Sequence, residues 1–449
     1  MNGKKVILRE RAQVMVIFAV ALVALLGLAA IAIDGGMLFS DRRYAQDAAD
    51  AAAMAGGGMV AKFFNTDHAH YSFINFSCPS TAALRHDAMA AAAVSAASNH
   101  FTIAPADLTL ANMGVEVLCT ETYTEKYLDM HVKITTQTKT SFVQLFYGGP
   151  LKSTVEAIVR IHPITPIAFG NAVVSLNPNC GQDGLYFNGN TNTIVSGGGV
   201  WSEGHIGKSG SAGDIYANPN PDDPLALIPQ INYYKDCPPP THPETFHPGA
   251  TKGQHHLNIT YQPDYDCTSP TWRGDGSPSS SQPLQPGRYG TISGGNLTFA
   301  PGLYCISSGM SLSNGTTHLA QGDDLNPYYG VTLIITGGNV QIGPNEFANL
   351  LAPSVDAPFG GIPGLLMYFP PSNSSGILDF QGNGESAKLQ GTIYHPTGLI
   401  NLHGNPGVSP NGSTEFIGWN VDVKGATNIN INYNGEGIVQ SPSRLDMLR

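Results

Sequence analysis

An uncharged run near the amino terminus limits what this chain can fold into more than any other feature. The run extends from Val14 to Ile33, and Asp34 ends it. At a rise of about 1.5 Å per residue, a helix of this length spans about 30 Å, the thickness of the hydrocarbon core of a bilayer. We therefore predict a transmembrane helix at residues 14–33, a basic cytoplasmic tail at residues 1–13, and the rest of the chain outside the cytoplasm.

Two other interpretations of the run remain open. A cleavable signal peptide is one alternative, because Ala30-Ile31-Ala32 is similar to a cleavage site with small residues. A processed pilin is the other, although Gly3 and Glu10 do not have the usual spacing between a Gly cleavage site and a following Glu. The length of the run and the helical pattern that follows it favour the uncleaved anchor.

The composition excludes two broad classes of protein. The 449 residues include 22 Lys and Arg against 33 Asp and Glu, which gives a net charge of -11. An acidic chain without a basic stripe is not expected to bind nucleic acid. Because 42% of the residues are hydrophobic, the chain is also not expected to be disordered. The 52 Gly and 32 Pro favour β-structure with many turns. The length of the chain suggests about three folding units.

All the cysteines of the chain follow the predicted span. Their even number in an exported region predicts disulfides, with free thiols as the alternative. We favour a pair between Cys78 and Cys119, with the other four bonded within the distal part of the chain. Those four are Cys180, Cys237, Cys267 and Cys305.

Residues 34–165 are predicted to form Ala-rich helices and a small sheet. The first helix is expected at residues 40–55, beginning at Ser40 or Asp41 and ending at Gly56-Gly57-Gly58. Its alanines recur at spacings of three and four and so form one apolar face of the helix. This face is suited either to self-association or to packing within its own domain, and we favour the second. A second Ala-rich helix is expected at 81–98, and strands are expected at 115–120, 127–138 and 154–161.

The segment around the predicted span resembles the amino-terminal segment of the TadE/TadG-like proteins of Flp (tight adherence) pilus systems. The resemblance consists of Arg11-Ala12-Gln13 before the span, the exit from Ile33 to Gly36, and the helix from Gln46 to Ala53. The residues that carry it are Arg11, Gln13, Asp34, Gly35, Gln46, Ala48, Ala49, Asp50, Ala51 and Ala52.

This resemblance implies a bitopic protein of the bacterial cytoplasmic membrane with a structural or adhesive role in pilus assembly or surface presentation. Its implied partners are the membrane and other pilus-assembly or envelope proteins. Many TadG proteins carry an Asp-x-Ser-x-Ser metal loop, which this sequence lacks. Metal-dependent adhesion is therefore not part of the expectation.

Residues 166–449 are predicted to form a β-rich head with a Pro-rich insertion at about 217–287. Short segments with alternating apolar residues recur between Gly and Asn turns, at 296–300, 302–306, 331–336, 339–343, 376–380, 387–394, 398–403, 414–423 and 429–433. We predict a right-handed parallel β-helix, with a β-sandwich as the alternative. Residues 389–404 are also similar to a pattern of β-helical surface proteins, which implies an architecture and no ligand. The tail after Val439 is expected to cover an open end of the head.

The head contains few candidates for a chemical site. His242, His247, His255 and His256 lie close together, but intervening prolines break a regular ligand spacing and favour a solvated loop over a metal site. Asp323-Asp324 favours a surface turn over a calcium or catalytic site.

The aromatic side chains of the head suit either sugar stacking or core packing, and they include Trp201, Trp272, Tyr328 and Tyr329. No familiar catalytic motif occurs in the sequence, so we expect no enzyme, cofactor or metal. The alternative function is a membrane-tethered protein that binds or cleaves carbohydrate.

Overall fold

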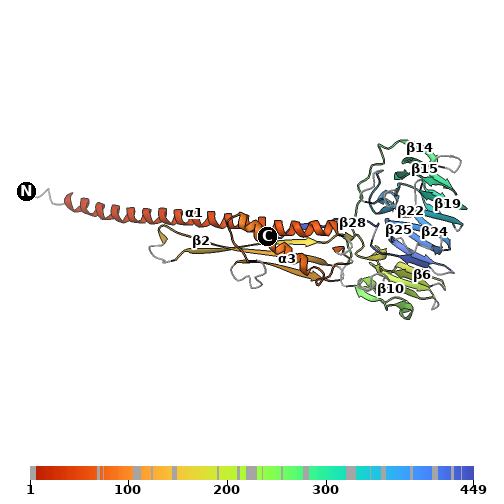
Figure 1. Ribbon diagram of the computed structural model, residues 1–449, viewed down its shortest axis with the longest axis horizontal. Coiled ribbons are helices and arrows are strands. Elements are labelled where there is room, and N and C mark those ends of the chain that lie inside the picture. The colour runs from red at the N-terminus through yellow and green to blue at the C-terminus, as the bar shows by residue number, and fades with distance from the viewer. Residues whose placement is uncertain are drawn as a thin grey trace, which may run out of the picture. The chain divides into compact units, whose positions relative to one another are not determined.

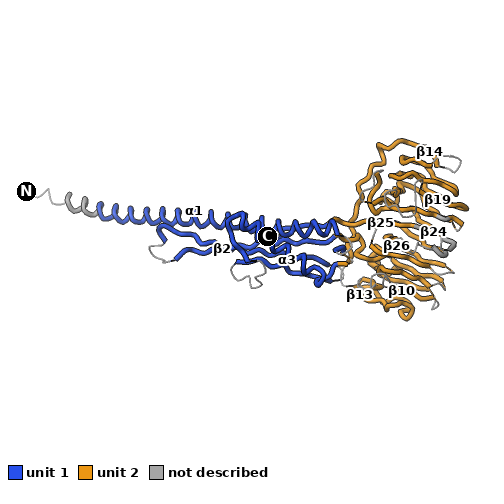
Figure 2. Tube along the Cα trace, viewed as in Figure 1, with its two compact units in different colours: residues 1–72, 76–163, 443–449 blue, residues 73–75, 164–442 orange. Residues whose placement is uncertain are grey.

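The structure of this chain is a computed structural model. It describes residues 7–67, 71–73, 75–104, 113–122, 125–143, 149–189, 192–209, 213–218, 230–234, 236–253, 256–276, 283–319, 330–343, 345–354, 360–384, 388–406, 413–425, 429–435 and 437–448. The chain divides into two compact units (Figure 2). Unit 1 contains residues 1–72, 76–163 and 443–449, and unit 2 contains residues 73–75 and 164–442.

Unit 1 combines two helices with an antiparallel sheet (Figure 1). Its elements are α1 (Ile7–Thr66), α3 (Ala82–Ser98), β1 (Gly114–Glu121), β2 (Lys126–Thr138), β3 (Leu151–His162) and β29 (Arg444–Met447). The order in the sheet is β1-β2-β3-β29. Met130, Val132 and Ile134 of β2 are fully buried in a common core with the helices, whereas the side chains between them are partly exposed. The predicted helix at 81–98 and the half-buried alternation of this strand are thus confirmed.

The first helix is longer than the sequence indicated. We predicted a membrane helix and then a second helix that would begin at Ser40 or Asp41 and end at Gly56-Gly57-Gly58. These boundaries are wrong, because α1 continues without interruption from Ile7 to Thr66. Each helical glycine costs about 1 kcal/mol relative to alanine, but burial of one face against the sheet outweighs this intrinsic cost.

The carboxy-terminal tail also differs from the expectation. It was expected to cover an open end of the head, but β29 pairs with β3 in the sheet of unit 1. Leu445 lies opposite Ile161 there, and Ser443 donates to the backbone oxygen of Ala61 in α1. The tail therefore covers the edge of β3 that its backbone would otherwise leave unpaired.

Unit 2 is mainly β. Its strands begin with β4 (Thr165–Pro166), β5 (Asn171–Ser175), β6 (Asp183–Asn188), β7 (Thr193–Ser196), β8 (Gly199–Ser202), β9 (His205–Ser209), β10 (Ile215–Asn218), β11 (Ile231–Tyr234), β12 (Phe246–His247) and β13 (Thr251–Gly253). The next are β14 (Trp272–Gly276), β15 (Gly287–Gly294), β16 (Thr298–Phe299), β17 (Gly302–Ile306), β18 (Met310–Leu312), β19 (Gly315–Leu319), β20 (Val331–Ile335), β21 (Val340–Ile342) and β22 (Glu346–Leu351). The last are β23 (Leu365–Tyr368), β24 (Ile377–Gly384), β25 (Lys388–Pro406), β26 (Thr414–Lys424), β27 (Ile429–Asn432) and β28 (Gln440–Ser441). Short 3₁₀ helices occur at η2 (Pro243–Thr245) and η4 (Pro371–Asn373).

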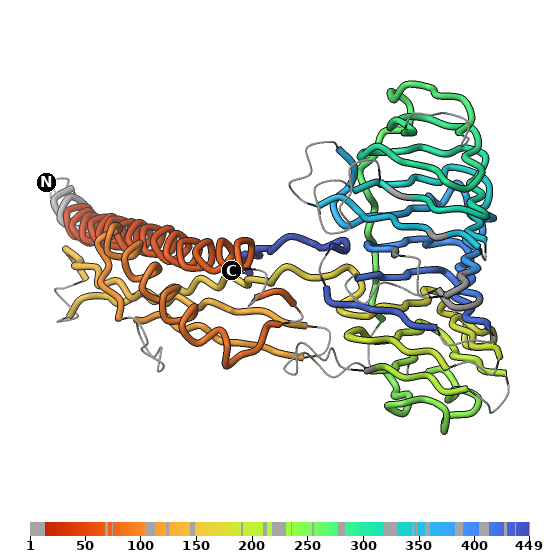
Figure 3. The backbone as a smooth tube through the Cα atoms, turned by 45° about the vertical axis from the view of Figure 1, so that its right-hand side comes forward, coloured from red at the N-terminus to blue at the C-terminus, as the bar shows by residue number. Residues whose placement is uncertain are grey.

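Parallel pairing in unit 2 follows a regular rule over its central strands. Strand β17 pairs with β20, β18 with β21, and β19 with β22, so that each strand lies beside the third strand after it (Figure 3). Inward side chains at equivalent positions then lie one above another. One such row consists of Tyr304, Leu333, Met367, Ile393, Phe416, Val173, Val200 and Ile231. All members of this row are at most 2% exposed.

The order of the strands in space differs from their order in the chain. Strand β26, near the end of unit 2, pairs with β5 and β6, near its beginning. The chain therefore enters the stack in the middle, extends it to β13 at one end, and restarts with β14 at the other end. Pairing of β4 with β28 confirms that the first and last strands of unit 2 are neighbours.

The two ends of the stack are joined by residues 256–271, here called the crossing segment. From β13 to β14 the stack passes through β11, β8, β5, β26, β25, β23, β20, β17 and β15. At a spacing of about 4.8 Å this is about 48 Å. The crossing segment contacts these strands in order. Leu257 N donates to Glu203 beyond β8 at 2.6 Å, Tyr261 packs on Tyr394 of β25, and Tyr265 packs on Tyr368 of β23.

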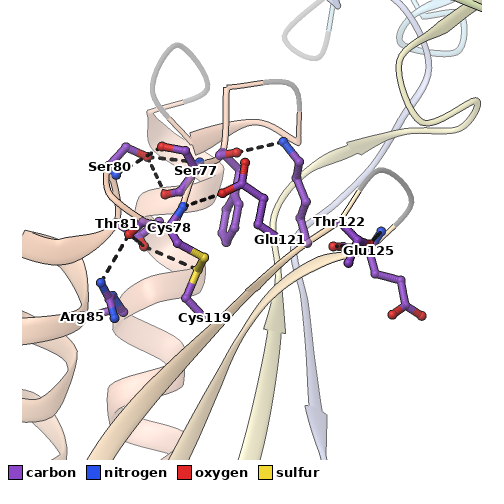
Figure 4. Close-up of a disulfide and its surroundings, with 11 residues drawn as sticks. Ser77, Cys78, Ser80, Thr81, Arg85, Cys119, Glu121, Thr122 and Glu125 are labelled. Atoms are coloured by element: carbon purple, nitrogen blue, oxygen red, sulfur yellow. Dashed lines mark hydrogen bonds between the residues drawn. A yellow bond between two sulfur atoms is a disulfide. The ribbon is translucent and has the colours of Figure 1, made fainter. Parts of the chain in front are cut away.

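Three disulfides complete the fold. Cys78 bonds to Cys119 in unit 1, as the sequence indicated, whereas Cys180 bonds to Cys237 and Cys267 to Cys305 in unit 2. The Cys78–Cys119 bond attaches the segment before α3 to β1, and Glu121 accepts a hydrogen bond from Cys78 N at 2.9 Å (Figure 4). Beside it, burial lowers the pKa of Lys126 to about 8, and its ammonium donates to Phe76 O at 2.8 Å.

Candidate functional site: the membrane helix and its exit

The first part of α1 is an exposed apolar helix. Its large apolar side chains are exposed: Ile17 is 68% exposed, and Leu25 and Ile31 are each 66% exposed. By length and composition it is the one helix in the described part of the chain that is able to cross a membrane. Such a surface is removed from water only by an apolar phase, and a bilayer supplies one of matching thickness.

Asp34 is the first residue after this apolar surface, and it is buried. It is 1% exposed, and its carboxylate accepts three backbone hydrogen bonds. Ser141 N donates to Oδ1 at 2.8 Å, while Phe142 N and Val143 N donate to Oδ2 at 2.9 and 2.6 Å. Three N–H donors compensate the charge for the loss of water. The carboxylate thereby holds the turn after β2 against the helix directly after the exposed apolar surface.

A second contact lies further along the same helix. Asp41, seven residues after Asp34 in α1, accepts a hydrogen bond from the hydroxyl of Thr138 at 2.6 Å. This bond holds the end of β2 beside the helix. The sequence offered Asp34 as part of a motif, but it did not indicate its partners. Those partners are more than a hundred residues away and contribute only backbone N–H groups, which carry no sequence signal.

Three alanines of the motif are buried in the core of unit 1. Ala48, Ala49 and Ala52 are at most 1% exposed and belong to a core that includes both helices and the sheet. Gln46 donates from Nε2 to Asp50 Oδ1 at 2.8 Å and to Glu156 O of β3 at 3.2 Å, which ties the helix to the sheet. This arrangement matches packing within the domain, the interpretation that the sequence favoured over self-association of that face.

Two further motif residues, Ala51 and Gly35, face away from the core of unit 1. Ala51 is exposed, and a Cβ added at Gly35 would meet no atom within 4 Å. Arg11 and Gln13 are helical, but their side chains lie outside the described residues.

Two glycines outside the predicted motif set how closely α1 approaches its neighbours. A Cβ on Gly56 would lie 2.7 Å from the backbone oxygen of Ala88 in α3 and against Met130 of β2. A Cβ on Gly57 would lie 2.8 Å from Leu445 Cδ2 and 3.0 Å from Val159 Cγ1. These glycines, which we interpreted as a helix stop, instead lie inside α1 where it packs closely on α3 and the sheet.

Three of the four candidate histidines are described by the structure, and each lies beside an acidic residue. His242 lies 3.2 Å from Glu244, His247 lies 3.8 Å from Asp214, and His256 contacts Glu203. Among the described residues, no group of three or more His, Cys, Asp or Glu side chains is suited to hold a metal ion. His255, Asp323, Asp324, Tyr328 and Tyr329 lie outside the described residues.

Three other polar or aromatic candidates in the head, Trp201, Glu415 and His395, are buried, and Trp272 is exposed. Trp201 is 1% exposed and donates to Glu203 at 3.2 Å, whereas Trp272 is 55% exposed. Burial raises the pKa of Glu415 to about 8 and lowers that of His395 to about 4, yet both side chains are 0% exposed. Perturbed pKa values often mark active sites, but these two groups have no access to solvent.

Comparison with known proteins gives one match. Residues 12–60 match a family model, Tad, described as Flp pilus-assembly TadE/G-like. The comparison with curated proteins found no match, and the comparison with solved structures found no match. The matched segment contains the apolar helix, Asp34, the Ala-rich face and both close-packed glycines. Together with the single candidate span, it fits a single-pass envelope protein related to Flp pili.

Proposed function

We propose that this protein is a bitopic component of an Flp-type pilus system, with a structural or adhesive role and no enzymatic activity. The observation that carries the proposal is that one helix contains both the candidate membrane span and part of the core of unit 1. The matched segment provides the membrane span, and the same helix forms the core of unit 1 without a break. A continuous helix of this kind is suited to transmit position or force from the membrane to the folded part outside it.

The orientation follows from charge. Lys4, Lys5, Arg9 and Arg11 precede the span, against one acid, Glu10. Positively charged flanks are retained in the cytoplasm during insertion, so we infer that the amino terminus lies inside and that the residues after the span lie outside. The disulfides of both units agree with this assignment, because such bonds persist in oxidising compartments.

We further infer that the β-region of unit 2 is a right-handed parallel β-helix. Support comes from the pairing of each strand with the third strand after it and from the stacked inward row that begins at Tyr304. The right hand is expected because crossover connections between parallel strands are almost always right-handed. A head of this type offers long flat surfaces for other pilus-assembly or envelope proteins.

Deleting the gene tests the proposal. We expect the deletion strain to lose surface pili or pilus-dependent attachment, and the wild-type gene to restore them. A version in which residues 1–33 are replaced by a cleavable signal peptide exports the same folded units without the anchor. We expect that version not to restore surface pili or pilus-dependent attachment in the deletion strain. An unchanged pilus number in the deletion strain, counted by electron microscopy, would contradict the proposal.

The alternative function, carbohydrate binding or cleavage, has one observation in its favour. A polar surface faces outward from adjacent strands β24, β25 and β26. It consists of Asp379, Gln381, Asn401, His403, Asp422 and Lys424. Asp379 and Asp422 flank Asn401 on neighbouring strands, which places two carboxylates about 10 Å apart along the stack.

A glycan panel separates this alternative from the pilus proposal. We expect the full-length protein in detergent to give no turnover of any glycan. Binding that is lost in a double variant, Asp379→Ala with Asp422→Ala, but kept in Asp264→Ala, which changes an exposed acid elsewhere, would establish a lectin-like head. Hydrolysis products would instead show that the protein is an enzyme.

A further inference from the structure

The turn held by Asp34 lies at the level where α1 leaves the bilayer. Ile33, the last residue of the apolar run, is 51% exposed, and Asp34 follows it by one helical rise of about 1.5 Å. Because the backbone nitrogens of Ser141, Phe142 and Val143 lie within 3 Å of the Asp34 carboxylate, these residues share that level. We call them the exit turn.

The side chain at the centre of the exit turn is aromatic and partly exposed. Phe142 is 41% exposed. Phe39 of α1, five residues after Asp34 and thus about 7.5 Å further along the helix, is 73% exposed. The polar layer of a bilayer extends about 5–8 Å beyond the hydrocarbon on each side, which includes both levels. Aromatic side chains concentrate in this layer in membrane proteins.

The charges near the exit turn agree with contact to lipid headgroups. Lys139 is exposed two residues before the exit turn, whereas Arg42 and Arg43 are exposed about 12 and 13.5 Å further along α1 than Asp34. The nearest acids are already bonded: Asp34 holds the turn, and Asp41 accepts from Thr138. The exit turn is therefore apolar at its tip and has one exposed lysine beside it, which suits a phospholipid phosphate.

We propose that the exit turn and Phe39 rest in the headgroup layer of the bilayer as a second membrane contact, positioned by Asp34. The protein then meets the membrane through two distant parts of its chain. The contact fixes the rotation of α1 about its own axis, because only one side of the helix carries the turn. This proposal requires insertion of residues 14–33, which the experiment below measures separately.

Site-directed spin labelling tests the proposal on the full-length protein. All six cysteines are in disulfides, so that an introduced cysteine is the only free thiol. Labels are placed by Phe142→Cys, Phe39→Cys, Leu25→Cys in the span and Val94→Cys, which is 69% exposed in α3. The protein is reconstituted into vesicles of phosphatidylethanolamine and phosphatidylglycerol. The collision rates of each label with oxygen and with a water-soluble nickel chelate are then measured.

We expect the oxygen-to-nickel ratio at residues 142 and 39 to be several-fold higher than at residue 94 and lower than at residue 25. Adding Asp34→Ala should lower the ratio at residue 142 towards that of residue 94 and leave residue 25 unchanged. A ratio at residues 142 and 39 equal to that at residue 94, while residue 25 reports hydrocarbon, would overturn the proposal. A ratio at residue 142 that Asp34→Ala leaves unchanged would overturn the positioning role of Asp34.

Discussion

Replacing Gly56 by leucine is expected to destroy the packing of unit 1. Its Cβ would lie 2.7 Å from a backbone oxygen of α3, at a buried position in the centre of the helix–sheet contact. A backbone atom cannot rotate away as a side chain can, so that α1 would have to separate from α3 and β2. Overpacking of this kind costs about 3 kcal/mol or more. Thermal unfolding of the full-length protein in detergent measures the loss.

Gly58→Leu is the matched control for this prediction. Gly58 is exposed on the same helix, and a Cβ there would meet no atom within 4 Å. Leucine has the higher helix propensity by about 0.8 kcal/mol, so that Gly58→Leu should leave unit 1 unchanged or slightly stabilised. Gly57→Ala should lie between the two, because the atoms it meets belong to the side chains of Leu445 and Val159, which are able to shift. Equal effects at Gly56 and Gly58 would show that close packing is not the reason for the glycines.

The double variant Cys267→Ser with Cys305→Ser should release the crossing segment from the stack. This disulfide closes a loop with a sequence separation of 38 and joins the segment to β17. Loss of a disulfide that closes a loop of this length costs about 4 kcal/mol. The remaining contacts of the segment, such as the packing of Tyr265 on Tyr368, are not expected to replace it. We expect a lower unfolding temperature for unit 2 and new protease cleavage within residues 256–271.

A substitution in the same segment serves as the control. Thr268 is exposed, and its side chain donates a hydrogen bond to Asp266 within the same segment. Thr268→Ala should therefore change neither the unfolding temperature nor the cleavage pattern. If the disulfide variant behaves like Thr268→Ala, the crossing segment is a passive connection that does not brace the stack.

Local patterns predicted the elements of this protein well. The apolar run, the alternation in β2 and the segments 302–306 and 331–336 correspond to α1, β2, β17 and β20. These signals depend on neighbouring residues, which the sequence shows directly. The favoured pairing of Cys78 with Cys119 is confirmed as well.

The errors arose where a residue has two roles that composition does not distinguish. Glycine ends helices, but it also allows close packing, and Gly56 and Gly57 serve the second purpose. Leu445 in the tail was interpreted as a cap for the head, although its strand completes the sheet of unit 1. Asp34 was recognised as a motif residue, but its function as acceptor for three distant N–H groups was not visible.

The sequence by itself determined that this chain has a membrane-spanning helix, an Ala-rich region and a β-rich region, because apolar runs and alternation act through local geometry. Only the tertiary structure decided that unit 2 is an insertion between β3 and β29, and that its stack is entered in the middle. It also decided which turn Asp34 holds at the membrane exit. Those features depend on backbone hydrogen bonds between residues far apart in the chain, and every residue except proline can donate them. No residue pattern therefore encodes which partner is chosen.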